Sequence, residues 1–436
     1  MAAGLIWVVN CVSARGTWPT LRPLRGVVEC PVLRPDGSVL QVPGYDESTG
    51  LLYEPAIDFP PVPEDPTWEQ VEQARDALLE VVCDFPFAQP VHRAAWLAGL
   101  LTGFARHAYR GMTPFFLVDG NVRGSGKSML VDAAAVIATG RTAARTSQAV
   151  KEEEEEKRIT SIALAGDPLV LIDNINRPFG SGVFDAALTG EEWKGRVLAT
   201  NTMPRMRLNT VWWGTGNNVR FASGVDTARR TLHIRFESLE ENPERRQAFR
   251  HPDLLEWVRA NRGRLAAAAL TILSMYVKQG RADQIALKTW GSFEAWSRLV
   301  RQCVHWIGLE DPYAAHEALT ESADTTATAL DDLLSGWLEL CKDNGVTACT
   351  ARQAVAWLDE DNQYRSVSSR HVLRWDRLRS ALAELMRIRH GSLPTERDLG
   401  YLLRGHKGRV VNGQRFKALA KSNAGIPWTV ETISSC

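Results

Sequence analysis

Short apolar runs, separated by glycine-containing loops and by helical patterns, mark the middle of the chain. Four of them have the length and composition of buried strands: Phe115–Val118, Leu169–Ile172, Val211–Trp213 and Thr231–Phe236. Strands that alternate with helices are typical of a parallel sheet. The pattern therefore predicts an α/β core.

The segments before this core follow other patterns. Residues 1–65 contain many turn residues, and a Pro-Asp-Gly turn at 35–37 between two apolar pairs predicts a β-hairpin. Thr67 and Gln70 form a capping-box pair at the start of a helical pattern. The apolar stretch 94–105 predicts a buried helix, since it is shorter than the ~20 residues that span a bilayer.

The C-terminal part is expected to form a separate domain. Helical stretches at Arg374–Arg389 and Glu396–Arg404 precede two strand-like segments, Arg409–Val411 and Trp428–Val430. We interpret this as a winged-helix-like domain. The expected organisation is a β-containing region (1–65), a helical connector (66–110), the α/β core (111–245), a helical region (246–320) and a basic domain (329–436).

Composition narrows the class of protein. Of 436 residues, 44% are hydrophobic and 23% charged, which excludes disordered and fibrous classes. The 51 basic and 51 acidic residues cancel, so any signal for nucleic acid must be local. Seven scattered cysteines without a CxxC pair fit neither a disulfide framework nor a structural zinc site. We expect a cytoplasmic protein without a membrane segment.

The segment NVRGSGKSM, residues 121–129, carries the clearest chemistry. It lies between a predicted strand and a predicted helix, the context in which a glycine-bearing loop holds phosphates. Lys127 is expected to reach the β and γ phosphates and Ser128 to bind Mg²⁺. Asn121 replaces the usual first glycine and tolerates positive φ better than most residues. The predicted nucleotide-binding residues are Asn121, Gly124, Ser125, Gly126, Lys127, Ser128 and Met129.

A candidate magnesium ligand follows the second core strand. Asp173 ends the run PLVLIDN, at the edge of the sheet where parallel strands present site residues. An ordinary strand capped by a polar turn is the alternative. The next residue is Asn174, where a glutamate would most commonly activate water. Glu153 or Glu154, in the acidic run 151–158, is a candidate for an inward-turned general base, whereas most of this run fits a solvated helical face.

Two later segments complete the candidate site. VWWGTGNN delivers Asn217 to a strand end, where its amide can position water or sense the γ phosphate. Arg229 and Arg230 then precede the last core strand. A guanidinium presented to a neighbouring subunit's nucleotide accelerates hydrolysis by roughly 10³ to 10⁵ where it has been measured. An arginine pair alone is more often only surface charge.

The order of these features resembles the core of an AAA+ ATPase. The chain further resembles the helicase portion of bacteriophage and plasmid primase-helicases, which are related to superfamily 3 helicases. This resemblance covers most of residues 20–310. It is carried by PVLRPDGSVLQVPGYDESTGLLY (31–53), EEKRIT (155–160), ALTGEEWKGRVL (187–198), TGNN (215–218), RR (229–230) and GSFEAWSRLV (291–300).

The resemblance implies a ring-forming, hexameric ATP-driven DNA helicase or translocase that uses ATP and Mg²⁺. Its site would contain Lys127, Ser128, Asp173, Asn217 and one or both of Arg229 and Arg230. Single-stranded or forked DNA is the expected partner, in replication of a phage, plasmid or integrated element. No primase active site is evident, so a separate polypeptide would synthesise primers.

Basic residues concentrate near the C-terminus. Between residues 374 and 421, twelve Arg or Lys residues face four acids: Arg374, Arg377, Arg379, Arg387, Arg389, Arg397, Arg404, Lys407, Arg409, Arg415, Lys417 and Lys421 against Asp376, Glu384, Glu396 and Asp398. Such a surface would bind DNA phosphates, or else serve packing or protein interaction. Weaker candidates for DNA contact are Lys194 and the turn 204–207. The alternative function is an ATP-switched DNA-binding or loading factor with slow hydrolysis.

Overall fold

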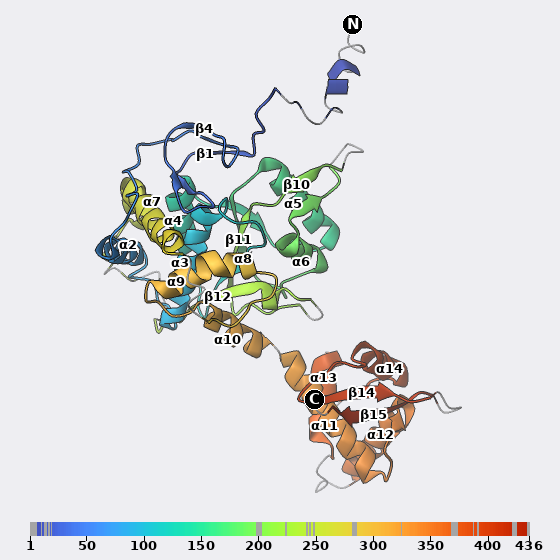
Figure 1. Ribbon diagram of the computed structural model, residues 1–436. Helices are drawn as coiled ribbons and strands as arrows, with labels where there is room; N and C mark the ends of the chain where they lie inside the picture. Colours follow the sequence, from blue (N-terminus) through green and yellow to red (C-terminus); the bar gives the residue numbers. More distant parts are fainter. Residues whose placement is uncertain are drawn as a thin grey trace. The chain divides into compact units, whose positions relative to one another are not determined.

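The computed structural model forms two compact units, residues 1–320 and 321–436 (Figure 1). None of the described helices is long and apolar enough to cross a bilayer. The finer five-part division expected from the sequence stays a prediction. The structure describes residues 7–9, 11–12, 15, 18 and 20–433 except 198–202, 223–224, 241–242, 244–245, 247–248, 281–285, 324, 368–373, 387, 390–391 and 421–424, and it describes no side chains for 322–328 and 364–367.

A five-stranded parallel sheet organises the larger unit, as the sequence predicts. Its strands occur in the order β12 (Thr231–Phe236), β6 (Phe115–Gly120), β11 (Val211–Asn217), β8 (Leu169–Ile175) and β7 (Ala144–Ser147). Sequence patterning missed β7, because this edge strand reads ARTS and is largely exposed. The strand β11 lies between β6 and β8, so their carboxyl ends meet at one edge.

Alternating side chains divide the sheet into two buried faces. In β6, Phe116 and Val118 pack into one core cluster, whereas Phe115 and Leu117 pack into another. This is the period-two alternation of a strand, with both faces apolar because helices cover both.

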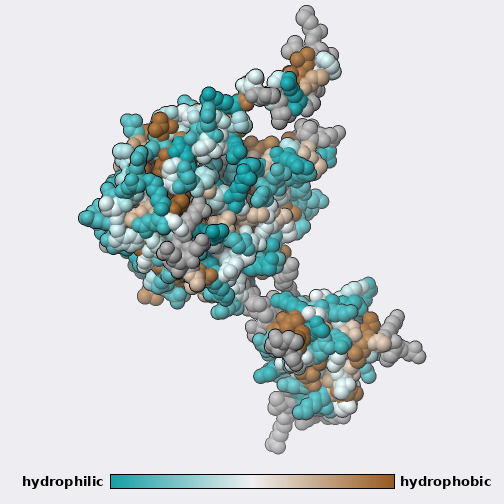
Figure 2. Space-filling view, in the orientation of Figure 1, coloured by the Kyte–Doolittle hydropathy of each residue, from teal (hydrophilic) through white to brown (hydrophobic). Residues whose placement is uncertain are grey.

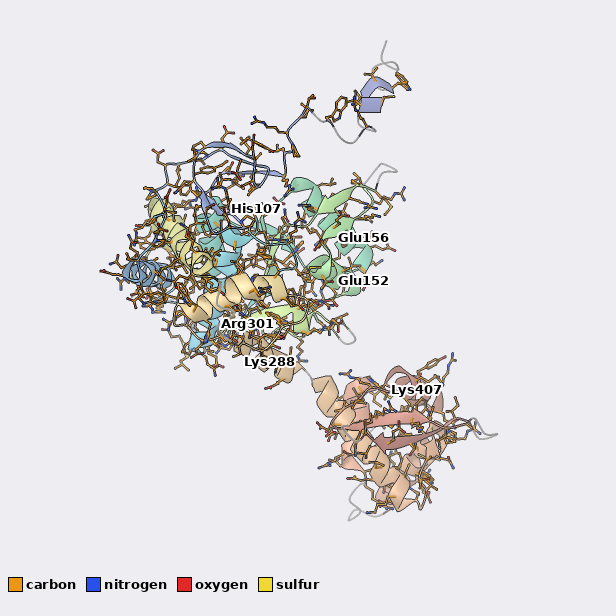
Figure 3. All side chains as sticks on the ribbon, in the orientation of Figure 1. His107, Glu152, Glu156, Lys288, Arg301 and Lys407 are labelled. Atoms are coloured by element: carbon orange, nitrogen blue, oxygen red, sulfur yellow. The ribbon has the colours of Figure 1, made fainter. Side chains whose placement is uncertain are left out.

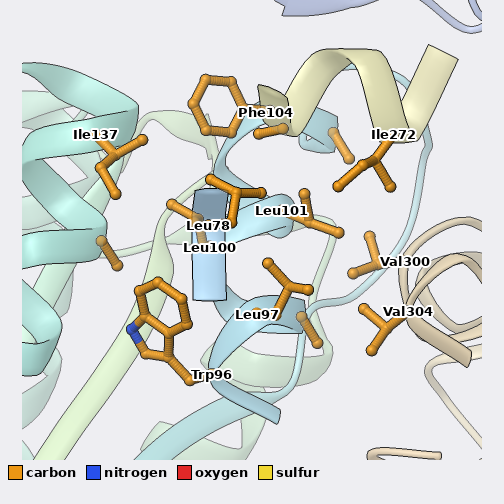
Figure 4. Packing of buried hydrophobic residues seen from close by; sticks show 14 of the residues in the cluster. Leu78, Trp96, Leu97, Leu100, Leu101, Phe104, Ile137, Ile272, Val300 and Val304 are labelled. Atoms are coloured by element: carbon orange, nitrogen blue, oxygen red, sulfur yellow. The ribbon is translucent and has the colours of Figure 1, made fainter. Parts of the chain in front are cut away.

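The first face holds the largest core. The helices α3 (Pro90–Ala105) and α4 (Lys127–Thr139) contact the sheet, and α2 (Trp68–Glu80) and α7 (Leu254–Lys278) pack against these helices. Thr67 and Gln70 form the predicted capping box of α2. Figure 4 shows Leu97 and Leu101 of α3 among Leu78, Ile272 and Val304 from other helices. The predicted buried helix at 94–105 is thus confirmed as part of α3.

The second face is covered by α5 (Glu152–Ala165) and α6 (Gly182–Thr189). A hairpin of β9 (Glu192–Lys194) and β10 (Arg205–Arg207) follows α6 and precedes β11. Figure 3 labels Glu152 and Glu156 on α5.

The N-terminal strands pack against the core through a hairpin whose first strand contacts α3 and α7. The predicted hairpin is confirmed as β2 (Val32–Leu33) paired with β3 (Val39–Leu40). Its turn residue Gly37 has φ +88°, and an added Cβ would lie 2.7 Å from Val277 of α7. Ser274 donates a hydrogen bond to the Gly37 carbonyl at 2.7 Å. A second small sheet contains β1 (Gly26–Val28), β5 (Leu51–Tyr53) and β4 (Gly44–Asp46).

Short helices complete the larger unit. They are α8 (Glu294–Trp296), the π-helical turn η3 (Ser297–Arg301), α9 (Gln302–Trp306) and α10 (Tyr313–Ala323). Arg301, labelled in Figure 3, is buried and donates to both carboxylate oxygens of Asp311 at 2.7 and 2.6 Å. The Arg301 guanidinium therefore stabilises the fold through its ion pair with Asp311.

The smaller unit has its own apolar core. It contains α11 (Thr325–Asp343), β13 (Cys349–Thr350), α12 (Ala351–Val367), α13 (Asp376–Met386), α14 (Glu396–Gly405), β14 (Gln414–Ala418) and β15 (Pro427–Thr432). The three strands form an antiparallel sheet in the order β13-β15-β14.

One predicted strand of this unit is wrong. Residues 409–411 precede a turn in which Asn412 and Gly413 have φ of 46° and 74°. An Asn-Gly pair favours such a turn because both residues tolerate positive φ. The strand therefore begins after the turn, at Gln414. The predicted strand at 428–430 is confirmed within β15.

Candidate functional site

The loop between β6 and α4 has the backbone that a phosphate site requires. Gly124 and Gly126 have φ of +72° and +82°, a region that L side chains rarely adopt. A Cβ on Gly126 would also lie 3.0 Å from the Phe85 ring. No side chain caps the first turn of α4. The helix N-terminus thus presents backbone N–H groups and a positive dipole end that suit an anion.

Lys127 joins this loop to the neighbouring strand. Its side chain is only 8% exposed, and Nζ donates to the Val122 carbonyl at 2.8 Å, Ser125 Oγ at 3.1 Å and Asn217 Oδ1 at 2.8 Å. Burial lowers the pKa of the Lys127 ammonium, and the Asp119 carboxylate opposes that shift. The structure thereby brings two sequence-predicted residues, Lys127 and Asn217, into direct contact.

Ser128 and Asp173 form the second contact between predicted residues. Ser128 Oγ donates to Asp173 Oδ1 at 2.9 Å, and Thr215 Oγ1 donates to the same oxygen at 2.6 Å. Arg145 Nη1 lies 3.2 Å from Asp173 Oδ2. Sequence reasoning missed Arg145 and Thr215. Thr215 gave a faint signal as a polar residue inside an apolar strand, whereas Arg145 gave none because β7 has no apolar pattern.

The hydroxyl and carboxylate oxygens of Ser128 and Asp173 are hard ligands that fit Mg²⁺. Among the described residues, no group of three or more His, Cys, Asp or Glu side chains could hold a metal alone. Magnesium commonly takes only one or two protein ligands and completes its shell with phosphate oxygens and water. The donor set is therefore compatible with a metal that arrives together with a nucleotide.

The two asparagines that end β11 have different surroundings. Asn217 contacts Lys127, as described above. Asn218 has φ 49°, and its Oδ1 accepts a hydrogen bond from Arg235 at 2.8 Å. Arg235 also donates to the buried carboxylate of Asp119 at 2.7 Å. Asn218 therefore fixes the strand end, and Asn217 faces the phosphate loop.

Asn121 differs from the expectation. It is not among the described residues with positive φ, so its tolerance of that conformation is not what the loop uses. Its side chain instead makes a reciprocal pair with the backbone of Ser238, with Nδ2 to the carbonyl at 2.9 Å and the Ser238 N–H to Oδ1 at 3.0 Å. Asparagine is needed here because glycine could not make this pair.

The expected inward turn of Glu153 or Glu154 is wrong for both. Each side chain is exposed, since it lies on the outer face of the first turn of α5. Glu154 forms an ion pair with Arg158 at 3.2 Å. The inward residue is Glu155, which accepts a hydrogen bond from Ser181, and burial raises the pKa of its carboxyl group.

Glu154 nevertheless lies near the site edge of the sheet. Arg158, its ion-pair partner, donates to the Ser147 carbonyl at 2.6 Å. Ser147 ends β7 directly opposite Asp173 in β8. A hydrogen-bonded path thus runs from Glu154 to the strand end beside the candidate metal ligand.

The two arginines before β12 have different environments. The Arg230 side chain is 12% exposed and pairs with Asp185 at 3.3 Å and Asp226 at 3.4 Å. The Arg229 side chain is 62% exposed and pairs with Asp226 at 3.3 Å. Arg230 therefore serves the fold of its own chain, and Arg229 is the one accessible to another molecule.

A cavity of about 560 Å³ adjoins the phosphate loop. Gly124, Gly126 and Met129 line one side of it, and Phe85 and Phe249 contribute apolar walls. The volume and apolar lining are typical of a small-molecule site. Phe85 was missed from sequence because it comes long before the loop in the chain.

The two weak candidates for DNA contact lie on one hairpin. Lys194 of β9 is the cross-strand partner of Arg205 of β10, and both side chains are exposed. Arg207 is exposed on the same strand as Arg205. This hairpin directly precedes β11, which ends at Asn217.

Comparisons with known proteins give similarity at low identity. Neither a protein-family model nor a curated protein matches the chain. Among solved structures, the chain is similar to the apo A form of the NrS-1 C-terminal region, at 13% identity and TM-score 0.40, over 99% of this chain and 90% of that one. SCCmec type IV Cch, described as an active helicase, has 12% sequence identity and a TM-score of 0.38, over 99% of this chain and 83% of that one. JCV helicase has 15% identity and a TM-score of 0.24, over 55% of this chain and 67% of that one.

Proposed function

We propose that the chain is an ATP-dependent, ring-forming DNA helicase or translocase that acts in the replication of a phage, plasmid or integrated element. One observation carries the ATPase part of this proposal. Side chains from the phosphate loop contact both neighbouring strand ends, Lys127 with Asn217 and Ser128 with Asp173, beside a cavity of nucleoside size.

Different residues of this site bind different parts of ATP. The amides around Gly126 and the Lys127 ammonium bind the phosphates, and the cavity lined by Phe85 and Met129 takes the base. Ser128 and Asp173 hold Mg²⁺, which neutralises charge on the β and γ phosphates when bound. When ATP binds, the Lys127 ammonium exchanges its hydrogen bond to Asn217 for one to the phosphates. The Asn217 amide is then free to position the attacking water.

The ring is inferred from Arg229. Its guanidinium is exposed, whereas the site of the same chain already contains Lys127 and Arg145 as its cations. An arginine supplied by the adjoining subunit would neutralise charge in the transition state and couple neighbouring sites. We therefore propose a homo-oligomer, with six subunits as the resemblance implies.

Contact with single-stranded or forked DNA is assigned to two surfaces. The β9–β10 hairpin presents Lys194, Arg205 and Arg207 to solvent in the larger unit. The winged-helix-like smaller unit supplies the second basic surface. Primer synthesis is left to a separate polypeptide.

A second candidate function is an ATP-switched DNA-binding or loading factor with slow hydrolysis. It is favoured by Asn174, which follows Asp173 with φ 56° and an exposed side chain, so no carboxylate stands beside the metal ligand on β8. In this case ATP drives assembly on DNA, and its hydrolysis only resets the protein.

Steady-state ATPase assays with and without single-stranded DNA separate the two functions. ATP turnover that is stimulated by DNA and abolished by Lys127→Ala supports the motor. Nucleotide-dependent DNA binding with negligible turnover supports the switch. The control is Lys157→Ala, which removes an exposed cation from α5, away from the phosphate loop. ATPase that survives Lys127→Ala would refute both.

A further inference from the structure

Several cations of the smaller unit already form ion pairs with its acids. Arg374 pairs with Asp343 at 2.8 Å, and the buried Arg379 pairs with Asp361 at 2.8 Å. On β14, Arg415 and Lys417 share the carboxylate of Glu431, which lowers the pKa of that group. These cations of the sequence-predicted basic cluster stabilise the fold. Two further members, Arg387 and Lys421, lie outside the described residues.

The outer face of α14 is different. Arg397, Tyr401 and Arg404 lie one helical turn apart on it, and all three are exposed. The Arg404 guanidinium lies 4.6 Å from the centre of the Tyr401 ring, and that of Arg397 lies 5.6 Å away. Among the described residues, no carboxylate lies within ion-pair distance of either guanidinium. Lys407, labelled in Figure 3, follows the helix and extends the positive surface.

Neither acid of α14 forms an ion pair with Arg397 or Arg404, because each makes a different contact. Glu396 pairs with Arg352 of α12 at 3.0 Å. Asp398 accepts a hydrogen bond from the hydroxyl of the helix-capping residue Thr395 at 2.6 Å. The helix is also held rigidly, since Leu399 and Leu403 are fully buried on its inner side. The face therefore presents two oriented guanidinium groups on a fixed support.

We propose that this α14 face, formed by Arg397, Tyr401, Arg404 and Lys407, binds the phosphate backbone of duplex DNA. The proposal deepens the DNA-binding part of the proposed function and rests on it. Guanidinium groups bind phosphate through paired N–H donors. Seven residues of helix separate the two arginines by about 10 Å along the axis, which is close to the ~12 Å width of the major groove.

The arrangement of Tyr401 favours duplex over single-stranded DNA. Proteins that hold single strands stack bases on open aromatic rings. Here cations from both neighbouring helical turns lie within cation–π distance of the ring, so the ring orients guanidinium groups, and a base that stacked on it would have to compete with them. A surface of this kind recognises phosphates without reading bases.

The test is a titration of the full-length chain, without nucleotide, against a labelled random-sequence duplex and the matching single strand. For duplex DNA, log K falls with log salt by about 0.9 per neutralised phosphate. The double variant Arg397→Gln/Arg404→Gln should therefore lose about 1.8 from the slope. When the salt concentration rises from about 50 to about 200 mM, the factor by which its affinity falls should be roughly twelve times smaller than the factor for the wild type.

Arg415→Gln is the matched control, because it removes a partly exposed cation of the same unit whose acidic partner, Glu431, remains paired with Lys417. It should leave the slope unchanged. A double variant that binds duplex DNA with the wild-type slope overturns the proposal and leaves this face to a protein partner. Loss of single-strand binding alone overturns it equally. Nucleotide binding, measured separately on the same variants, reports failure of the ATP site independently.

Discussion

The ion pair between Arg145 and Asp173 leads to a specific prediction, because Asp173 carries the carboxylate that we assign to the metal. Arg145 Nη1 lies 3.2 Å from Asp173 Oδ2, and its other terminal nitrogen contacts the buried Asp132. A magnesium ion that binds Asp173 must compete with this guanidinium. The substitution Arg145→Gln removes the competitor, so Mg²⁺-dependent nucleotide binding should become tighter.

The expected size follows from the exposure of the pair. The Arg145 side chain is 47% exposed and that of Asp173 is 28% exposed, so solvent screens their attraction. Exposed ion pairs are worth about 0.2–1 kcal/mol. The Mg²⁺ concentration that half-saturates nucleotide binding should therefore fall by roughly 1.4-fold to fivefold. Stability should also fall by about 1 kcal/mol, since Asp132 keeps only the Ala143 N–H as a partner.

A fluorescent ATP analogue, titrated over a series of Mg²⁺ concentrations, measures the shift without any turnover. Arg141→Gln serves as the control, because Arg141 is exposed and pairs with Glu29 away from the site. An unchanged or higher Mg²⁺ midpoint for Arg145→Gln would refute the competition. A loss of nucleotide affinity at zero Mg²⁺ would show instead that Arg145 binds phosphate directly.

Further substitutions test the remaining assignments. Arg229→Ala should leave ATP binding intact yet reduce the ATPase of mixed rings by more than its share of subunits, whereas simple additivity would refute a shared site. Arg230→Ala should instead lower the free energy of unfolding in urea by about 3 kcal/mol, since it leaves Asp185 buried without its cation. Phe85→Ala should weaken nucleotide binding about tenfold without moving the Mg²⁺ midpoint; an unchanged affinity would remove the cavity from the site. Gly126→Ala, at φ +82°, should cost about 1–2 kcal/mol of stability, and a neutral effect would contradict the left-handed loop.

The sequence predicts those parts of the structure that a local pattern encodes. The strands β6, β8 and β11 are buried on both faces and therefore begin with continuous apolar runs. The edge strand β12 instead alternates apolar residues with the partly buried His233 and Arg235. An exposed edge strand such as β7 has no such pattern. The predicted strand 409–411 was wrong for another reason: the φ preference of Asn412 and Gly413, rather than the valines before them, fixes where the chain reverses.

The candidate site divides in the same way. Lys127 and Asp173 follow recognisable strand and loop patterns, so their place at one edge of the sheet was predictable. Phe85 and Arg145 reach the site only through tertiary packing, from segments whose own sequences give no sign of chemistry. The glutamate of α5 that turns inward also differs from the prediction, because the helical phase places Glu155 inward and its neighbours outward.

The backbone at the end of β8 explains why a glutamate is missing there. Asn174 has φ 56°, a conformation that asparagine tolerates and that costs other L residues about 1–2 kcal/mol. Its N–H donates to Thr215 Oγ1, which in turn donates to Asp173 at 2.6 Å. The turn that orients Asp173 therefore disfavours a glutamate beside it. In the proposed ATPase, a carboxylate that activates water therefore has to come from an element other than β8. The proposed function therefore assigns the metal ligand to β8 and assigns no residue of β8 to water activation.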